Sequence, residues 1–312
     1  MVNSVGPIVV ERIRKNIYMD NREVIGKLKG IRMNILGYRI ALLFVGLFYL
    51  IYFFLPERVM EDERMTILTY VMIIITGPVV AIGVSGATKL KGKSKELYND
   101  LLSSMIEYAY YEQDRGFTDI EVGTFGIIKI GNIYYSNNYF QGHYKGVGVR
   151  QADVIIQKET YIDEKSSITK YFDGRIFEFT TDKITAQNVK VFSRGYESWL
   201  NINDRRVDVD DLFFNDNFDV FSAEPSEAQE ILTREMIEHL LILQNQNRSI
   251  GFRFGVGKVF VAINGTRQFD VNSIDKIMYD KDFVIAKEGI QLIKDLIDGL
   301  GIGHKYIMCE DE

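Results

Sequence analysis

Two apolar runs near the start of the chain constrain its fold more than any other feature. Ile40 to Leu55 and Met65 to Thr88 contain no Asp, Glu, Lys or Arg, and only the charged stretch Pro56 to Arg64 separates them. The second run has 24 residues, about 36 Å of helix against a hydrocarbon core of roughly 30 Å. The first run needs a few preceding residues, with Arg39 reaching back to the headgroups. Both runs are apolar on all sides rather than along one stripe, so they predict a transmembrane hairpin with spans at 37–55 and 66–88.

The positive charges around the hairpin predict its orientation. Eight Lys or Arg residues precede residue 40, and Lys89, Lys91, Lys93 and Lys95 follow the second run, whereas the connecting loop has an acidic excess. Because Lys and Arg favour the cytosolic side, we expect both termini in the cytosol and a location in the inner membrane. The four lysines are the predicted contacts with lipids of the inner leaflet.

Small residues recur every four positions in the second run, at Gly77, Ala81 and Ser85. Such a stripe lets another helix approach closely. Two uses remain open: packing against the first span through Gly46, which we favour, and packing against a second copy in a homo-oligomer. Neither run contains an ionisable residue at depth, which argues against a proton or ion pathway.

The remaining chain divides into an amphipathic helical segment before the hairpin, residues 1–36, and a cytosolic domain after it, residues 89–312. From residue 96 onwards there are 23 Lys and Arg against 36 Asp and Glu, a net charge of −13. Nucleic acid would repel such a domain. The single cysteine, Cys309, allows no internal disulfide, as is usual in a reducing compartment.

The domain is expected to be α+β. A helix leaving the membrane is predicted from Leu97, Leu101, Leu102, Met105, Ile106 and Ala109, which recur at helical spacing. Short runs rich in aromatic and β-branched residues follow, with a turn at Asp173 and Gly174, and they predict a meandering antiparallel sheet. The predicted strands are 125–130, 133–135, 154–157, 176–179 and 189–192.

A helical segment is predicted in the middle of this sheet, from about Ser222 to Gln246. Ser226 and Gln229 have the spacing of a capping box, and Thr233 can begin a second helix. A hairpin is expected next, turning at residues 255–258, and a C-terminal helix near residues 287–300 with Gly299 or Gly301 as its stop.

These last elements resemble a known family. The order of 218–222, 227–233, 236–241, 250–252 and 257–263 is similar to that in the bacterial membrane proteins called domain of unknown function thirty-one thirty-seven. The resemblance implies two spans near the N-terminus and a cytosolic α+β domain. It implies no catalytic or binding residues.

The sequence offers no assembled chemistry, so we predict no catalytic residue, no cofactor and no metal site. The three histidines, His143, His239 and His304, belong to no ligand pair. The resulting expectation is a membrane-anchored, non-enzymatic interaction or sensor module with a protein partner. Two alternatives remain: a tethered hydrolase that uses carboxylates such as Asp208 and Asp210, and a structural subunit of a larger membrane assembly.

Overall fold

The computed structural model describes residues 21–54, nine single positions between 70 and 96, and then 99–162, 165–186, 188–195, 205–247, 249–265 and 280–304. The chain divides into two compact units. Unit 1 comprises Met1–Ser104 and Asn272–Asp282, and unit 2 comprises Met105–Val271 and Phe283–Glu312.

Unit 1 contains the long helix α2, Asn21–Phe53. The predicted amphipathic segment and the first apolar run therefore share one continuous helix from residue 21. Large apolar side chains of α2 lie exposed along its length, among them Met33, Leu36, Ile40, Leu43, Phe44, Leu47 and Leu50.

The second apolar run lies beside α2 at two described points. The side-chain oxygens of Tyr49 and Thr76 are 2.8 Å apart. A Cβ atom added to Gly86 would lie 3.1 Å from Cζ of Tyr38. Tyr38 precedes Tyr49, whereas Gly86 follows Thr76, so the two segments run antiparallel.

No helix within the described part of the chain is long and apolar enough to cross a membrane. Most of the predicted span 66–88 lies outside the described residues, as do Ser85, Lys89, Lys91, Lys93 and Lys95.

Unit 2 is built on one antiparallel sheet. Nine strands of the described residues form it, in the order β1-β2-β3-β4-β9-β8-β5-β7-β6. Their bounds are β1 Glu107–Glu112, β2 Ile133–Tyr144, β3 Val147–Ile162, β4 Lys165–Thr180, β5 Val189–Ser193, β6 Arg206–Val207, β7 Phe218–Ser222, β8 Ile250–Gly255 and β9 Lys258–Asn264.

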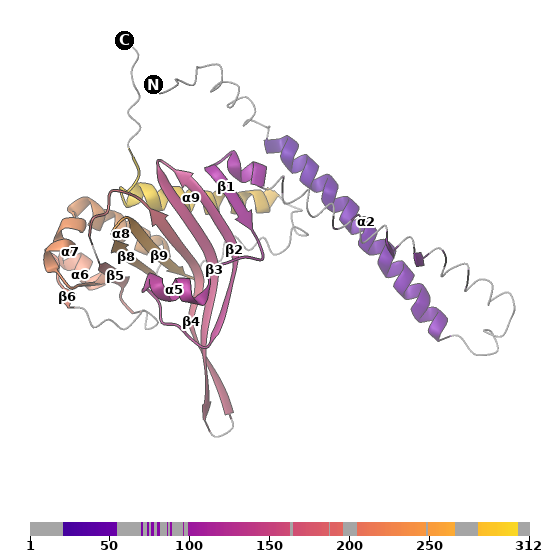
Figure 1. The fold of residues 1–312 in the computed structure, drawn as a ribbon, viewed down its shortest axis with the longest axis horizontal. Coiled ribbons are helices and arrows are strands. Elements are labelled where there is room, and N and C mark those ends of the chain that lie inside the picture. Colours follow the sequence, from indigo (N-terminus) through magenta and orange to yellow (C-terminus); the bar gives the residue numbers. More distant parts are fainter. Residues whose placement is uncertain are drawn as a thin grey trace, which may run out of the picture. The chain divides into compact units, whose positions relative to one another are not determined.

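Helices pack on both faces of this sheet (Figure 1). The short helix α5, Asp119–Phe125, lies in front of the strands in that view, and α9, Asp280–Gly299, crosses behind them. The three remaining helices lie near the β5–β7–β6 edge: α6 Leu212–Asn217, α7 Pro225–Ile231 and α8 Arg234–Asn247.

Each face of the sheet has its own core. On the α5 face, Val122 and Phe125 of the helix join a cluster that includes Ala152, Ile176 and Ala262. Alternation along the strands sends the neighbouring side chains to the other face. There the buried aromatic residues are Phe140, Phe177, Phe179, Phe252 and Phe254.

The predicted mixed fold is confirmed in unit 2, including the central helices, the β8–β9 hairpin and the C-terminal helix. Gly301 ends α9 with φ +63°. The amide of Gly301 donates to the carbonyl of Asp298 and that of Ile302 to the carbonyl of Ile297, which is the Schellman pattern.

Two strand-level predictions are wrong. Residues 125–130 form no strand, because Phe125 ends α5 and turns inward to stack on Phe260 at 4.8 Å. Asp173 and Gly174 form no turn but lie inside β4. A Cβ on Gly174 would lie 2.1 Å from the carbonyl oxygen of Ile263 on β9. Glycine at this position therefore lets the backbones of β4 and β9 approach closely.

Two helix-level predictions are also wrong. Ser226 is not a cap, because α7 begins at Pro225 after the N-cap residue Glu224. The helix predicted through Ala109 ends earlier: Ser104 and Met105 form a turn, and the chain then enters β1.

Candidate functional site

A cleft of about 360 Å³ opens on unit 2 where three segments meet. These are the loop after β4, the junction between α7 and α8, and the C-terminal end of α9. The polar lining comes from Lys183, Thr185, Glu230, Thr233, Glu235 and His239. Ile184, Met236 and Leu300 contribute apolar surface.

The loop that forms one wall is fixed by hydrogen bonds. The amide of Thr181 donates to the carbonyl of Gly257 at 3.0 Å, and the amide of Gly257 donates to the carbonyl of Ile184 at 2.9 Å. The Thr181 hydroxyl also donates to the carbonyl of Ile302 at 3.1 Å. The loop is thereby tied both to the β8–β9 turn and to the end of α9.

Lys183 holds the end of α9 at the cleft. Its ammonium group donates to the carbonyls of Gly301 and Gly303. A cation at this position also complements the partial negative charge at a helix C-terminus. The side chain therefore positions α9, and its nitrogen is not a free nucleophile.

The α7–α8 junction forms the opposite wall. The amide of Met236 donates to the Thr233 hydroxyl at 3.3 Å, so Thr233 begins α8 as the sequence predicts. His239 lies two turns further along α8. A Cβ on Gly299 would lie 4.0 Å from Cβ of His239, so the α9 end closes the cleft against this helix.

The ionisable groups that line the cleft are at least partly exposed or already bonded. A catalytic centre needs a nucleophile or acid–base pair within hydrogen-bond reach. Here Glu230 and Glu235 are exposed, and the ammonium of Lys183 is bound to carbonyls. No group of three or more His, Cys, Asp or Glu side chains in the described segments could hold a metal ion.

A second polar cluster lies on the α5 face and anchors that helix. Glu178 of β4 is almost fully buried and accepts hydrogen bonds from Arg150 Nε at 2.5 Å and Lys258 Nζ at 2.6 Å. Arg150 also donates to Glu121 of α5 at 3.2 Å. The cluster therefore joins the start of α5 to the sheet.

The end of α5 is held by Arg253 of β8. Its Nη1 donates to the carbonyl of Thr124 at 2.8 Å and to that of Phe125 at 3.1 Å. Its Nε donates to Oδ1 of Asn188 at 3.0 Å. A cation thus occupies the carbonyl end of α5, where the helix dipole favours it.

The ionisable groups around α5 respond to this packing. Burial alone would raise the pKa of Glu121, but hydrogen bonds from Thr118 and Arg150 outweigh it and lower the pKa below its ordinary 4.5. Burial alone would lower the pKa of Arg150, yet Glu178 raises it. Burial raises the pKa of Tyr134 to about 12, and its hydroxyl donates to the carbonyl of Phe117. Both ends of the salt-bridge cluster are therefore charged near neutral pH.

A row of buried polar side chains lies on the opposite face. The hydroxyl of Tyr111 donates to Asn138 Oδ1 at 2.8 Å, and Nδ2 of Asn138 donates to Asp153 Oδ2 at 2.8 Å. Arg175 Nε lies 3.8 Å from Asp153 Oδ1. Because Arg175 is fully buried, the row is part of the core and offers no open site.

The predicted site residues do not gather in the cleft. Gly77 and Ala81 are exposed, and a Cβ on Gly77 or on Gly46 would meet no atom of the described residues within 4 Å. Ser85 and the four lysines lie outside the described residues. The Asp208 side chain is 77% exposed and pairs with Arg206 at 3.7 Å, and Asp210 is also exposed. These two acids therefore do not form the concave pocket that a hydrolase would need.

Sequence reasoning missed the cleft because its lining residues come from positions 183–301 and converge only in the folded chain. No second histidine lies four residues from His239, as a zinc-binding helix would require. In the folded chain His239 lies beside Gly299 at the end of α9. His143, which lies in β2, and His304 are both exposed.

Comparisons with known proteins find a similarity over part of unit 2. No curated protein matches the chain in sequence. The crystal structure of the mycobacterial trehalose monomycolate transport factor A, TtfA, aligns with a TM-score of 0.35 and 10% identity, covering 66% of this chain and 95% of that one. A likeness this distant supports no conclusion. The model of the family described as "Protein of unknown function (DUF3137)" matches residues 170–301, so the resemblance read from the sequence is confirmed for this part of the chain.

Proposed function

We propose that this protein is a membrane-anchored interaction module, whose unit 2 binds a partner in the cytosol and catalyses no reaction. The anchor is the pair of apolar runs, in the inner membrane with both termini in the cytosol. The recognition surface is the cleft between the loop 183–185, α8 and the end of α9.

One observation supports the membrane anchor. In unit 1 large apolar side chains are exposed and a polar side chain is buried, which is the reverse of the pattern in a protein that folds in water. Leu43 and Phe44 of α2 are 72% and 68% exposed, whereas Thr76 is 8% exposed and hydrogen-bonded to Tyr49. In water, each exposed apolar Å² costs about 25 cal/mol. In lipid, exposed apolar surface has no such cost. Polar groups must instead form hydrogen bonds within the protein, as Tyr49 and Thr76 do.

The charge distribution supports the orientation and the class of partner. The lysines at 89–95 follow the second run directly and favour the anionic inner leaflet. The cytosolic part has a net charge of −13, which argues against binding of nucleic acid. The cleft offers both charge signs and apolar surface, so a polar small molecule or a protein segment suits it.

Anchoring is tested by washing native membranes with alkaline carbonate. We expect the full chain to stay in the pellet, and the double variant Leu43→Arg with Ile74→Arg to move to the supernatant, because a central arginine in each run opposes insertion by roughly 2.5–3.5 kcal/mol. Leu43→Ala with Ile74→Ala is the matched control and should stay in the pellet. Recovery of the unmodified chain in the supernatant would refute the anchor.

Recognition is tested with a photo-cross-linking amino acid at Thr185 in the full chain, in native membranes. We expect one adduct of defined mass, lost in Glu235→Lys and kept in Glu224→Lys, which lies outside the cleft lining. Substrate turnover that depends on a cleft residue would show instead that the protein is an enzyme.

A further inference from the structure

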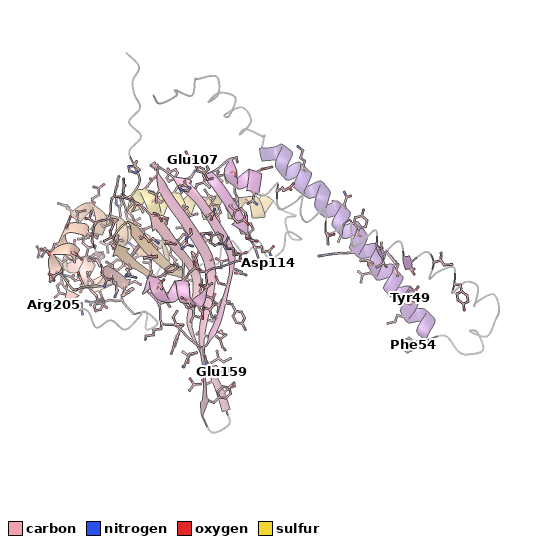
Figure 2. The ribbon with its side chains drawn as sticks, in the orientation of Figure 1. Tyr49, Phe54, Glu107, Asp114, Glu159 and Arg205 are labelled. Atoms are coloured by element: carbon pink, nitrogen blue, oxygen red, sulfur yellow. The ribbon has the colours of Figure 1, made fainter. Side chains whose placement is uncertain are left out.

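The β3–β4 hairpin extends well beyond the sheet (Figure 1). Its last pairing with β2 is Gln157 with Ile133, and its last pairing with β9 is Gly174 with Asn264. Beyond these points the strand pairs of Lys158–Ile162 are with Lys165–Thr169 among the described residues. The side chain of Asn132 also accepts from the amide of Glu159 at 2.7 Å and donates to its carbonyl at 3.0 Å. Glu159, labelled in Figure 2, lies on this projecting part, which is called the arm from here on.

The arm has no core of its own. Ser166 to Lys170 are all exposed, although successive side chains of a strand point to opposite faces. Both faces of the arm are therefore open. A two-stranded hairpin without a third strand or a packed face is marginally stable in water.

One face of the arm carries exposed aromatic and aliphatic side chains between polar ones. Ile155, Gln157, Glu159 and Tyr161 alternate along β3 and share a face. Cross-strand pairing adds Tyr135, opposite Ile155, and Ile168, opposite Glu159. Tyr135, Tyr161 and Ile168 are 62%, 70% and 56% exposed, and they form what we call the arm stripe.

The charges on the arm are balanced, unlike those of the cytosolic part as a whole. Residues 157–170 contain Lys158, Lys165 and Lys170 against Glu159, Asp163 and Glu164. Two copies with a net charge of −13 each repel one another over most of their surface. A patch without net charge that also carries exposed apolar side chains is where they can meet.

We propose that the arm stripe is the contact surface for a second copy of this chain. A two-fold axis along the arm lays β3 of one copy over β4 of the other, so the stripe packs against itself. Glu159 then lies one residue pair away from Lys170 of the second copy, within reach of its side chain, which within one copy pairs with Asp173 at 2.8 Å. This opposite-charge contact lies between Tyr135 and Tyr161, so charge complementarity adds to the apolar contacts of the stripe.

The first test measures the mass of the full chain in detergent micelles by light scattering across a concentration series. We expect a dimer, and a dissociation constant at least about tenfold higher for Tyr161→Ser with Ile168→Ser. The matched control is Leu212→Ser with Phe213→Ser, two exposed apolar residues on α6, which should leave the dimer unchanged. A monomeric wild type, or a dimer insensitive to the arm variant, would overturn the proposal.

The second test excludes a mere folding defect. Glu159→Lys should weaken the dimer, and adding Lys170→Glu should restore it, because the swap re-forms the opposite-charge contact. In native membranes, Tyr161→Cys in a Cys309→Ser background should give a dimer that a short bis-maleimide cross-links, and Leu212→Cys should not. A cross-link from position 161 to another polypeptide would mean that the arm binds a different partner. Neither test depends on the cleft.

Discussion

The side-chain oxygens of Tyr49 and Thr76 lie 2.8 Å apart although 27 positions separate them in the sequence. This hydrogen bond joins the two apolar runs, and Thr76 is among the few buried polar residues of unit 1. It therefore fixes how the second run is aligned along α2.

We expect Tyr49→Phe and Thr76→Val to be coupled in a double-mutant cycle. Hydrogen bonds between membrane helices contribute about 0.6 kcal/mol on average and rarely more than about 1.7 kcal/mol. Thermal unfolding of the full chain in micelles measures the coupling. Additive effects of the two substitutions would show that the contact contributes nothing.

Arg253 is predicted to be the strongest single tether of α5. Its guanidinium reaches two carbonyls of the helix end and one asparagine side chain. Arg253→Met should lower the free energy of unfolding by about 2–3 kcal/mol, since hydrogen bonds to charged groups each contribute about 1.5–3 kcal/mol. Urea unfolding of the full chain in micelles measures this loss.

Arg234→Met is the matched control for Arg253. Arg234 is almost fully exposed and pairs with Glu238 one turn along α8. Such pairs contribute about 0.3–0.5 kcal/mol. Equal losses in the two variants would contradict the proposed capping of α5.

The stability that Glu121 contributes is predicted to depend on pH. Hydrogen bonds from Thr118 and Arg150 lower its pKa in the folded chain below 4.5. A carboxyl group with a lowered folded pKa stabilises the fold above its unfolded pKa and loses that contribution as the pH falls through the folded pKa. The melting temperatures of the wild type and Glu121→Gln should therefore differ at pH 6 and converge towards pH 3. A constant difference over this range would refute the assignment.

Glu121 also shows what the sequence could have predicted. Thr118 and Glu121 have the spacing of a capping box, and both of its hydrogen bonds form in the structure. The capping-box spacing could therefore have predicted the start of α5. The helix has only seven residues, however, and the β-type composition of 125–130 favoured a strand instead. Ser226 and Gln229 have the same spacing, yet Pro225 occupies the first helical position and moves the start of α7.

Long periodic elements were predictable for a simple reason. In α9 the buried positions Ile290, Ile293, Leu296, Ile297 and Leu300 repeat at helical spacing, so one face of the helix specifies its packing. Gly174 illustrates the opposite case. Its role depends on the backbone of Ile263, which lies 89 positions away, and no local pattern contains that information. The cleft is hidden for the same reason.

Gln151 leads to a prediction of increased stability. It is fully buried in β3, and neither its amide nitrogen nor its amide oxygen has a hydrogen-bond partner among the described residues. A buried polar group without a partner costs about 1–3 kcal/mol. Methionine has a similar length and no such group, so Gln151→Met should raise the free energy of unfolding by an amount in this range. Chemical denaturation of the full chain in micelles measures the gain.

Gln291→Met is the control for Gln151. Gln291 is exposed on α9 and donates to Asp295 one turn further on. Surface substitutions of this kind usually change stability by less than about 0.5 kcal/mol. A loss of stability in Gln151→Met with no change in Gln291→Met would mean that the buried amide does have a partner in the folded chain. The polar row of Asn138, Asp153 and Arg175 would then extend to Gln151, and the inner face of β3 would be a connected polar network rather than an apolar core interrupted by one costly side chain.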